Sequence, residues 1–106
     1  EDIVKYYSAA KAHALVSWME TPGLSSLEAA AMGCNIVVTE KGDTRDYFGD
    51  AAFYCEPDDI GSITKALKQA LSSENKSFLQ AKIKIDYSWR NAAKQTLAGY
   101  EKILGF

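Results

Sequence analysis

Apolar and polar residues follow two different periods along this 106-residue chain. In five stretches the apolar residues recur every three or four positions, which predicts amphipathic helices; these stretches are 3–10, 24–31, 60–71, 78–85 and 89–104. Short apolar runs of strand-forming residues lie between them, at 13–18, 36–39 and 51–55. A loop that opens at Gly42 predicts one more short helix, which we expect to close at Gly49.

Of the short apolar runs, the one at 36–39 is the most informative about the sheet. Ile36-Val37-Val38-Thr39 is β-branched throughout, as expected for a strand that is buried on both faces of a parallel sheet. Strand and helix alternate with short connections, which favours right-handed βαβ crossovers and parallel strands in sequential order. Three strands are about half of a six-stranded dinucleotide-binding sheet. We therefore predict an α/β fold, a three-layer Rossmann-like half-domain with a short parallel sheet between helices and further helices at the C-terminus.

The expected helix ends have signals of their own. Gly33 is expected to end the second helix in a left-handed cap. Asp58 or Asp59 is expected to cap the helix that follows the third strand, and Ser88 is expected to cap the final helix.

Composition narrows the function classes. Twelve basic and 14 acidic residues give a net charge of −2, which argues against a dedicated nucleic-acid binder. No apolar run approaches the ~20 residues that span a bilayer. Cys34 and Cys55 are too few for a disulfide scaffold and suit buried thiols in a reducing cytoplasm. We expect a cytoplasmic protein, and a start at Glu1 inside a helical pattern suggests a piece of a longer parent, for which the inner membrane face is an alternative location.

The stretch from Ser17 to Glu28 is where chemistry is expected. It runs from the carboxyl end of a strand, through a Pro-Gly turn, into a helix N-terminus, and ligands of open α/β sheets bind at that edge. The backbone N–H groups of residues 23–26 are expected to be unpaired and, together with the helix dipole, to attract phosphate. Glu20 and Glu28 can converge on neighbouring hydroxyl groups, because one carboxylate accepts two hydroxyl hydrogens.

A purely structural interpretation of the same residues stays open at this point. Ser25-x-x-Glu28 has the pattern of a capping box, in which Glu28 reaches back to the Ser25 amide and serves only helix stability. Thr21-Pro22 likewise has the pattern of an N-cap followed by proline at the first helical position. Ser17 could contact a ligand or bond its own backbone.

The two glutamates also carry a resemblance to a known family. Glu20-x7-Glu28, with Pro22-Gly23-Leu24 between them, resembles the E-x7-E segment of the group 1 retaining nucleotide-sugar glycosyltransferases, which have the GT-B fold. Further segments resemble the same family over nearly the whole chain: Ser17-x-x-Glu20, Ile36-Val37-Val38-Thr39, Gly49-Asp50-Ala51-Ala52 followed by Pro57-x-Asp59, and Ser88-Trp89.

The resemblance implies roles at matching positions. Glu20 would be the catalytic glutamate that approaches the donor sugar, and Glu28 would bind the ribose hydroxyls of the donor nucleotide. Gly23, Leu24 and Ser25 would hold the diphosphate or the sugar. The nucleotide-diphosphate sugar would be a substrate rather than a cofactor, and no metal is expected.

The resemblance also implies what lies elsewhere. Residues 1–106 would be a fragment of the C-terminal nucleotide-sugar-binding domain, and the partner domain that binds the acceptor would precede it in the same chain. The Arg and Lys that neutralise the leaving diphosphate would also lie upstream, so the fragment is expected to be inactive. Asn35 stands where the family usually has proline, which is expected to loosen a turn and leave the donor site intact.

Other residues have simpler interpretations. His13 is expected to be a strand histidine without a catalytic or metal role, and Trp89 a packing anchor. The outer edge of the strand near Leu15 and one face of the last helix would be left open, which favours self-association. Two other functions stay open: a non-enzymatic βαβ regulatory or assembly module, and a piece of a sugar epimerase or phosphorylase with the same two-domain architecture.

Overall fold

A computed structural model describes residues 2–21 and 23–105 of the chain. Its elements, in order, are α1 (Asp2–Ala9), β1 (Ala12–Leu15), α2 (Leu24–Ala31), β2 (Asn35–Thr39), α3 (Thr44–Phe48), η1 (Gly49–Ala51), β3 (Phe53–Cys55), α4 (Ile60–Ser72), α5 (Ser77–Asp86) and α6 (Trp89–Leu104). The proline of the expected Pro22-Gly23 turn lies outside the described residues.

The three strands form one parallel sheet in the order β1-β2-β3, which confirms the predicted α/β half-domain. Two strands are shorter than the sequence predicts, because the pairing of β1 ends earlier, at Leu15, and the pairing of β3 starts later, at Phe53. β1 pairs with β2 only as far as the Leu15–Val38 register, and residues 16–18 continue as loop. At the start of the third strand, Gly49–Ala51 forms a turn of 3-10 helix instead of extended backbone.

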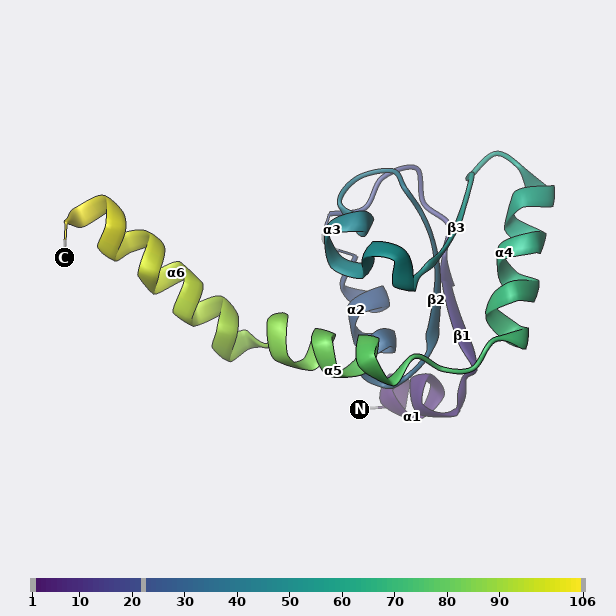
Figure 1. The fold of residues 1–106 in the computed structure, drawn as a ribbon, viewed down its shortest axis with the longest axis horizontal. Coiled ribbons are helices and arrows are strands. Elements are labelled where there is room, and N and C mark those ends of the chain that lie inside the picture. Colours follow the sequence, from purple (N-terminus) through teal and green to yellow (C-terminus); the bar gives the residue numbers. More distant parts are fainter. Residues whose placement is uncertain (1, 22, 106) are drawn as a thin grey trace.

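Helices cover both faces of the sheet, and α4 alone covers one of them (Figure 1). Val37 points to the α4 side, where it packs with Cys55, Ala66 and Ala70. Ile36 and Val38 point to the other side, which α2, α3 and α5 cover. All five residues of β2 are buried, as the β-branched run predicts for a central strand.

The predicted helix ends are present. Gly33 follows α2 with a φ of 95°. Asp59, rather than Asp58, is the N-cap of α4, and its carboxylate accepts from the Ser62 amide at 3.1 Å. The Ser88 hydroxyl accepts from the Asn91 amide at 3.1 Å and caps α6.

Asn35 has a different role from the one expected. It is the first residue of β2, it is 2% exposed, and it does not loosen a turn. Its side-chain amide donates to the Ala70 carbonyl at 2.8 Å and to the Ser73 carbonyl at 3.1 Å. Because the last carbonyls of a helix lack intrahelical donors, Asn35 fastens the C-terminal end of α4 to the sheet.

Helix α6 extends away from the body of the molecule (Figure 1). None of its described residues is buried, and Trp89 is 87% exposed, so the expectation that Trp89 anchors packing is wrong for this chain. The described part of the chain pairs β1 only with β2, so the outer edge of β1 is open. No helix among residues 2–21 and 23–105 is long and apolar enough to cross a membrane.

Candidate functional site

The candidate site lies where β1 ends and α2 begins, at the carboxyl edge of the sheet. Ser17 is half-buried there, and its backbone carbonyl accepts a hydrogen bond from the Thr39 hydroxyl at 2.7 Å. The bond ties the loop after β1 to the end of β2. The segment that leads to the two glutamates is therefore held to the sheet beyond the last paired strand residue.

Glu20 is fixed through its backbone. The Glu20 amide donates to the Lys41 carbonyl at 3.1 Å, and the Glu20 carbonyl accepts from the Asp43 amide at 3.0 Å. These two bonds make Glu20 and Gly42 an isolated parallel bridge that extends the sheet by one residue. The loop after β2 is thus part of the site. The motifs in the sequence did not predict this contact.

The start of α2 contradicts the capping interpretation. Gly23 is the N-cap residue, it has a left-handed backbone with φ 62° and ψ 59°, and no side chain in the described part of the chain caps the helix. Ser25 and Thr21 are therefore not at the N-cap position, and the capping box through Glu28 is not formed. Glycine adopts this left-handed conformation readily, whereas other residues are strained in it.

The open backbone donors at this helix end are fewer than predicted. The Ser26 amide is paired, since it donates to the Gly23 carbonyl at 3.1 Å. Within the described residues, the Gly23, Leu24 and Ser25 amides donate to no backbone carbonyl. These N–H groups and the positive end of the helix dipole make this turn attractive to an anion.

The Glu20 side chain lies beside that helix end. A Cβ atom placed on Gly23 would be 3.7 Å from the Glu20 Cβ and 3.7 Å from Glu20 Oε2. The half-buried carboxylate therefore stands next to the turn where an anion would bind. A side chain at position 23 would both strain the backbone and fill the space beside Glu20.

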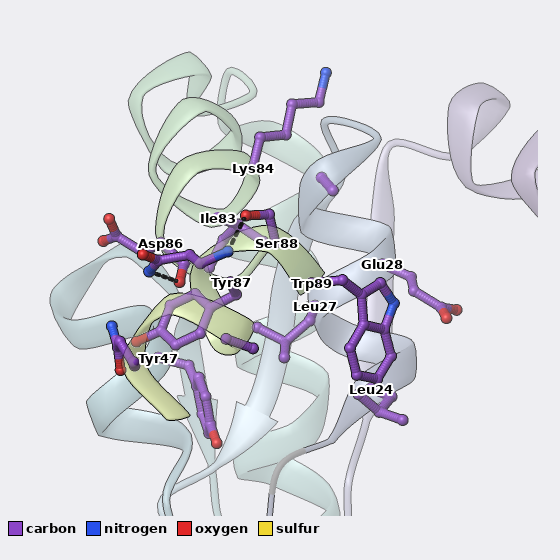
Figure 2. A pocket seen from close by; sticks show the side chains of 14 residues that line it. Leu24, Leu27, Glu28, Tyr47, Ile83, Lys84, Asp86, Tyr87, Ser88 and Trp89 are labelled. Atoms are coloured by element: carbon purple, nitrogen blue, oxygen red, sulfur yellow. Dashed lines mark hydrogen bonds between the residues drawn. The ribbon is translucent and has the colours of Figure 1, made fainter. Parts of the chain in front are cut away.

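Glu28 lies one turn further along α2, on an exposed face. It lines a cleft of about 690 Å³ between α2 and the junction of α5 and α6, together with Leu24, Leu27 and Trp89 (Figure 2). In Figure 2 its carboxylate points away from the tyrosine-lined end of the cleft. Burial raises the pKa of Tyr7, and the negative charge of Glu28 raises it further.

The structure thus brings the predicted residues together in two groups. Glu20 and Gly23 are in contact, and Leu24 and Glu28 share the cleft. Ser17, Glu20, Gly23 and Ser25 do not line that cleft, so Glu28 lines it without Glu20.

The remaining titratable groups do not extend the site. The His13 ring lies in β1 with its centroid 5.6 Å from that of Tyr7, and burial lowers the pKa of His13. Among residues 2–21 and 23–105, no group of three or more histidine, cysteine or acidic side chains could hold a metal ion.

Comparison with known proteins gives consistent matches. Residues 1–95 match the family described as glycosyl transferases group 1. The O-antigen chain mannosyltransferase B of Escherichia coli is 29% identical over 108 residues, covering 95% of this chain and 28% of that protein. The D-inositol 3-phosphate glycosyltransferase of Corynebacterium urealyticum is 31% identical over 109 residues, covering 97% of this chain and 26% of that protein. The chain therefore spans about a quarter of the length of these relatives. No solved structure matches it.

Proposed function

Since the chain belongs to the group 1 glycosyl transferases, we propose that it is the donor-binding part of an enzyme that transfers the sugar of a nucleotide-diphosphate sugar to an acceptor with retention and releases the nucleoside diphosphate. The observation that carries this proposal is the turn from Glu20 to Ser25. There a carboxylate, a left-handed glycine and backbone N–H groups that have no acceptor among the described residues come together at the N-terminus of α2.

The diphosphate is assigned to the first turn of α2. The Leu24 and Ser25 N–H groups can donate to an anion, because no side-chain cap among the described residues occupies them. Gly23 lets the phosphate oxygens approach the backbone closely, because it has no Cβ. Phosphate at a helix N-terminus gains from both the free donors and the helix dipole.

The two glutamates contact different parts of the donor. Glu20, beside Gly23, faces the sugar, where its negative charge can stabilise positive charge that develops at the anomeric carbon. Glu28, exposed one turn along the helix, accepts hydrogen bonds from the ribose hydroxyls. No capping bond occupies Glu28, so its oxygens are available for that purpose.

The enzyme would use no metal and would neutralise the leaving diphosphate with cationic side chains outside residues 1–106. An upstream acceptor-binding domain would complete the active site. Residues 1–106 alone would then bind nucleotide weakly and transfer no sugar, because electrostatic stabilisation of the leaving group is a large part of such catalysis. The mannosyltransferase among the relatives favours a hexose as the transferred sugar.

Three variants of the whole enzyme test this assignment. Glu28→Gln should weaken the binding of both bare nucleotide and nucleotide sugar by about tenfold, the loss of one good hydrogen bond to a charged group. Glu20→Ala should lower kcat far more than it changes the Kd of bare nucleotide. Glu74→Gln, an exposed glutamate in the α4–α5 loop, removes one charge and should change neither quantity.

Affinity and turnover are measured separately, by calorimetry with the nucleoside diphosphate and by steady-state kinetics. If Glu28→Gln left nucleotide affinity unchanged but lowered the free energy of unfolding, the ribose assignment would be wrong. If Glu20→Ala weakened bare nucleotide as much as nucleotide sugar, Glu20 would not face the sugar.

A further inference from the structure

We propose that Gly42 is a positioning residue that sets the place of Glu20 in the site, an inference that rests on the proposed role of Glu20. No part of the E-x7-E segment includes Gly42, which is 22 positions further along the chain than Glu20. The two residues meet only because the loop after β2 folds back along the end of the sheet.

The contact between the two residues is backbone against backbone. Gly42 has a φ of 97°, and a Cβ atom added to it would collide with the Glu20 carbonyl oxygen and lie 2.9 Å from the Glu20 nitrogen. Neither partner is the end of a flexible side chain that could swing aside. Any side chain at position 42 therefore requires one of the two backbones to move.

The loop that carries Gly42 is anchored by more side-chain hydrogen bonds than the segment that carries Glu20. Thr44, which is 5% exposed, donates its hydroxyl hydrogen to the Thr39 carbonyl at 2.5 Å. Arg45 bonds Glu40 and Asp50, each at 2.8 Å, and so closes the loop from both of its sides. These bonds oppose a shift of residues 40–45 away from Glu20.

The segment around Glu20 is loosely packed by comparison. Trp18 and Met19, which precede Glu20, are 67% and 71% exposed. The described hydrogen bonds of the Glu20 backbone are the two to the Gly42 loop itself. A Cβ at position 42 would therefore displace Glu20 rather than the loop, and its carboxylate would leave its place beside Gly23.

The main test is Gly42→Ala in the whole enzyme, with Gly33→Ala as the matched control. Gly33 also has a positive φ, 95°, but the nearest atoms that a Cβ there would meet belong to the Gln80 side chain, at 3.7 Å, which is ordinary van der Waals contact. Both variants place a side chain at a positive φ, and only Gly42→Ala collides with the Glu20 backbone. We expect Gly42→Ala to lower kcat by about 100-fold, the cost of misplacing a catalytic group by about 1 Å. The Kd of bare nucleoside diphosphate and the kcat of Gly33→Ala should stay within about twofold of the parent.

Coupling to Glu20 separates positioning from a general structural effect. In a Glu20→Ala background, Gly42→Ala should lower kcat no further, because the group it displaces is already absent. If the two losses multiply instead, or if Gly42→Ala and Gly33→Ala behave alike, the proposal is overturned. Should Gly42→Ala fail to fold, Thr39→Val removes the bond between β2 and the Ser17 carbonyl and should show a smaller kcat loss with the same coupling.

A readout that does not depend on the role of Glu20 keeps the two proposals distinct. The Asp43 amide bonds the Glu20 carbonyl, so its hydrogen exchange reports the bridge directly. Faster exchange in Gly42→Ala than in Gly33→Ala supports the positioning contact even if Glu20→Ala leaves kcat unchanged, which would refute only the role of Glu20. Equal exchange in the two variants refutes the positioning contact.

Discussion

Replacing Asn35 with alanine is expected to destabilise the fold measurably without touching the candidate site. The side chain is 2% exposed and makes two hydrogen bonds, to the Ala70 and Ser73 carbonyls. At about 0.5–1.5 kcal/mol each, their loss amounts to about 1–3 kcal/mol. Within the described residues, Asn35 Oδ1 is buried without a partner, and removing it recovers part of that loss. The expected net change is about 1–2 kcal/mol.

Thermal and urea unfolding followed by circular dichroism measure this change. A loss of about 1–2 kcal/mol lowers the Tm of a domain this size by roughly 5–15 °C. Asn35→Asp is the sharper companion variant, because it keeps the shape but turns a carboxylate toward two carbonyl oxygens. It should cost more than Asn35→Ala at neutral pH and recover partly in acid, when the protonated group can donate. If Asn35→Ala stays within about 0.5 kcal/mol of the parent, or if Asn35→Asp is as stable as the parent at pH 7, the two hydrogen bonds do not stabilise the fold as proposed.

Three further predictions concern helix ends, pH and assembly. Asp59→Ala should lower the free energy of unfolding by about 1 kcal/mol, because it removes the N-cap of α4, whereas urea titration of Asp58→Ala should show almost no change. Burial lowers the pKa of His13 in the folded chain below its ordinary 6.5, so the unfolded state binds the proton more readily. The contribution of His13 to the free energy of unfolding of the 106-residue chain should therefore be complete above pH 6.5 and decrease as the pH falls below that value. His13→Leu should abolish this pH dependence. If the pH dependence persists in His13→Leu, it has another source. The isolated chain should self-associate through the open edge of β1 or the exposed face of α6, and light scattering that showed only monomer at millimolar concentration would contradict this.

The architecture could be predicted because the hydrophobic pattern of each segment agrees with the element that the segment forms in the fold. The β-branched run Ile36-Val37-Val38-Thr39 is typical of a strand that is covered by helices on both faces of a sheet. Because short connections join alternating strands and helices, parallel strands in sequential order are then expected. Asp59 and Ser88 also acted as their positions suggested, since an N-cap depends on residues within one turn.

The errors arose where a residue's role depends on distant partners. Thr21 and Ser25 each offered a plausible N-cap, but the structure has Gly23, in a left-handed conformation, at that position. Trp89 was expected to pack, but no described residue of α6 is buried and Trp89 is 87% exposed. The Glu20–Gly42 bridge joins two loops, and the one signal for it in the sequence was a glycine in the loop that follows β2.

Amide chemical shifts can show whether the first turn of α2 binds the diphosphate of the donor. The whole enzyme is labelled with ¹⁵N on leucine and serine and titrated with UDP, GDP and ADP in turn. For the nucleotide that binds, the Leu24 and Ser25 amides should show the largest shifts in this domain, because they are the free donors of that turn. Glu28→Gln should raise the Kd of the titration without changing which amides respond. Saturable binding that leaves Leu24 and Ser25 unperturbed, with the shifts elsewhere, would contradict the account.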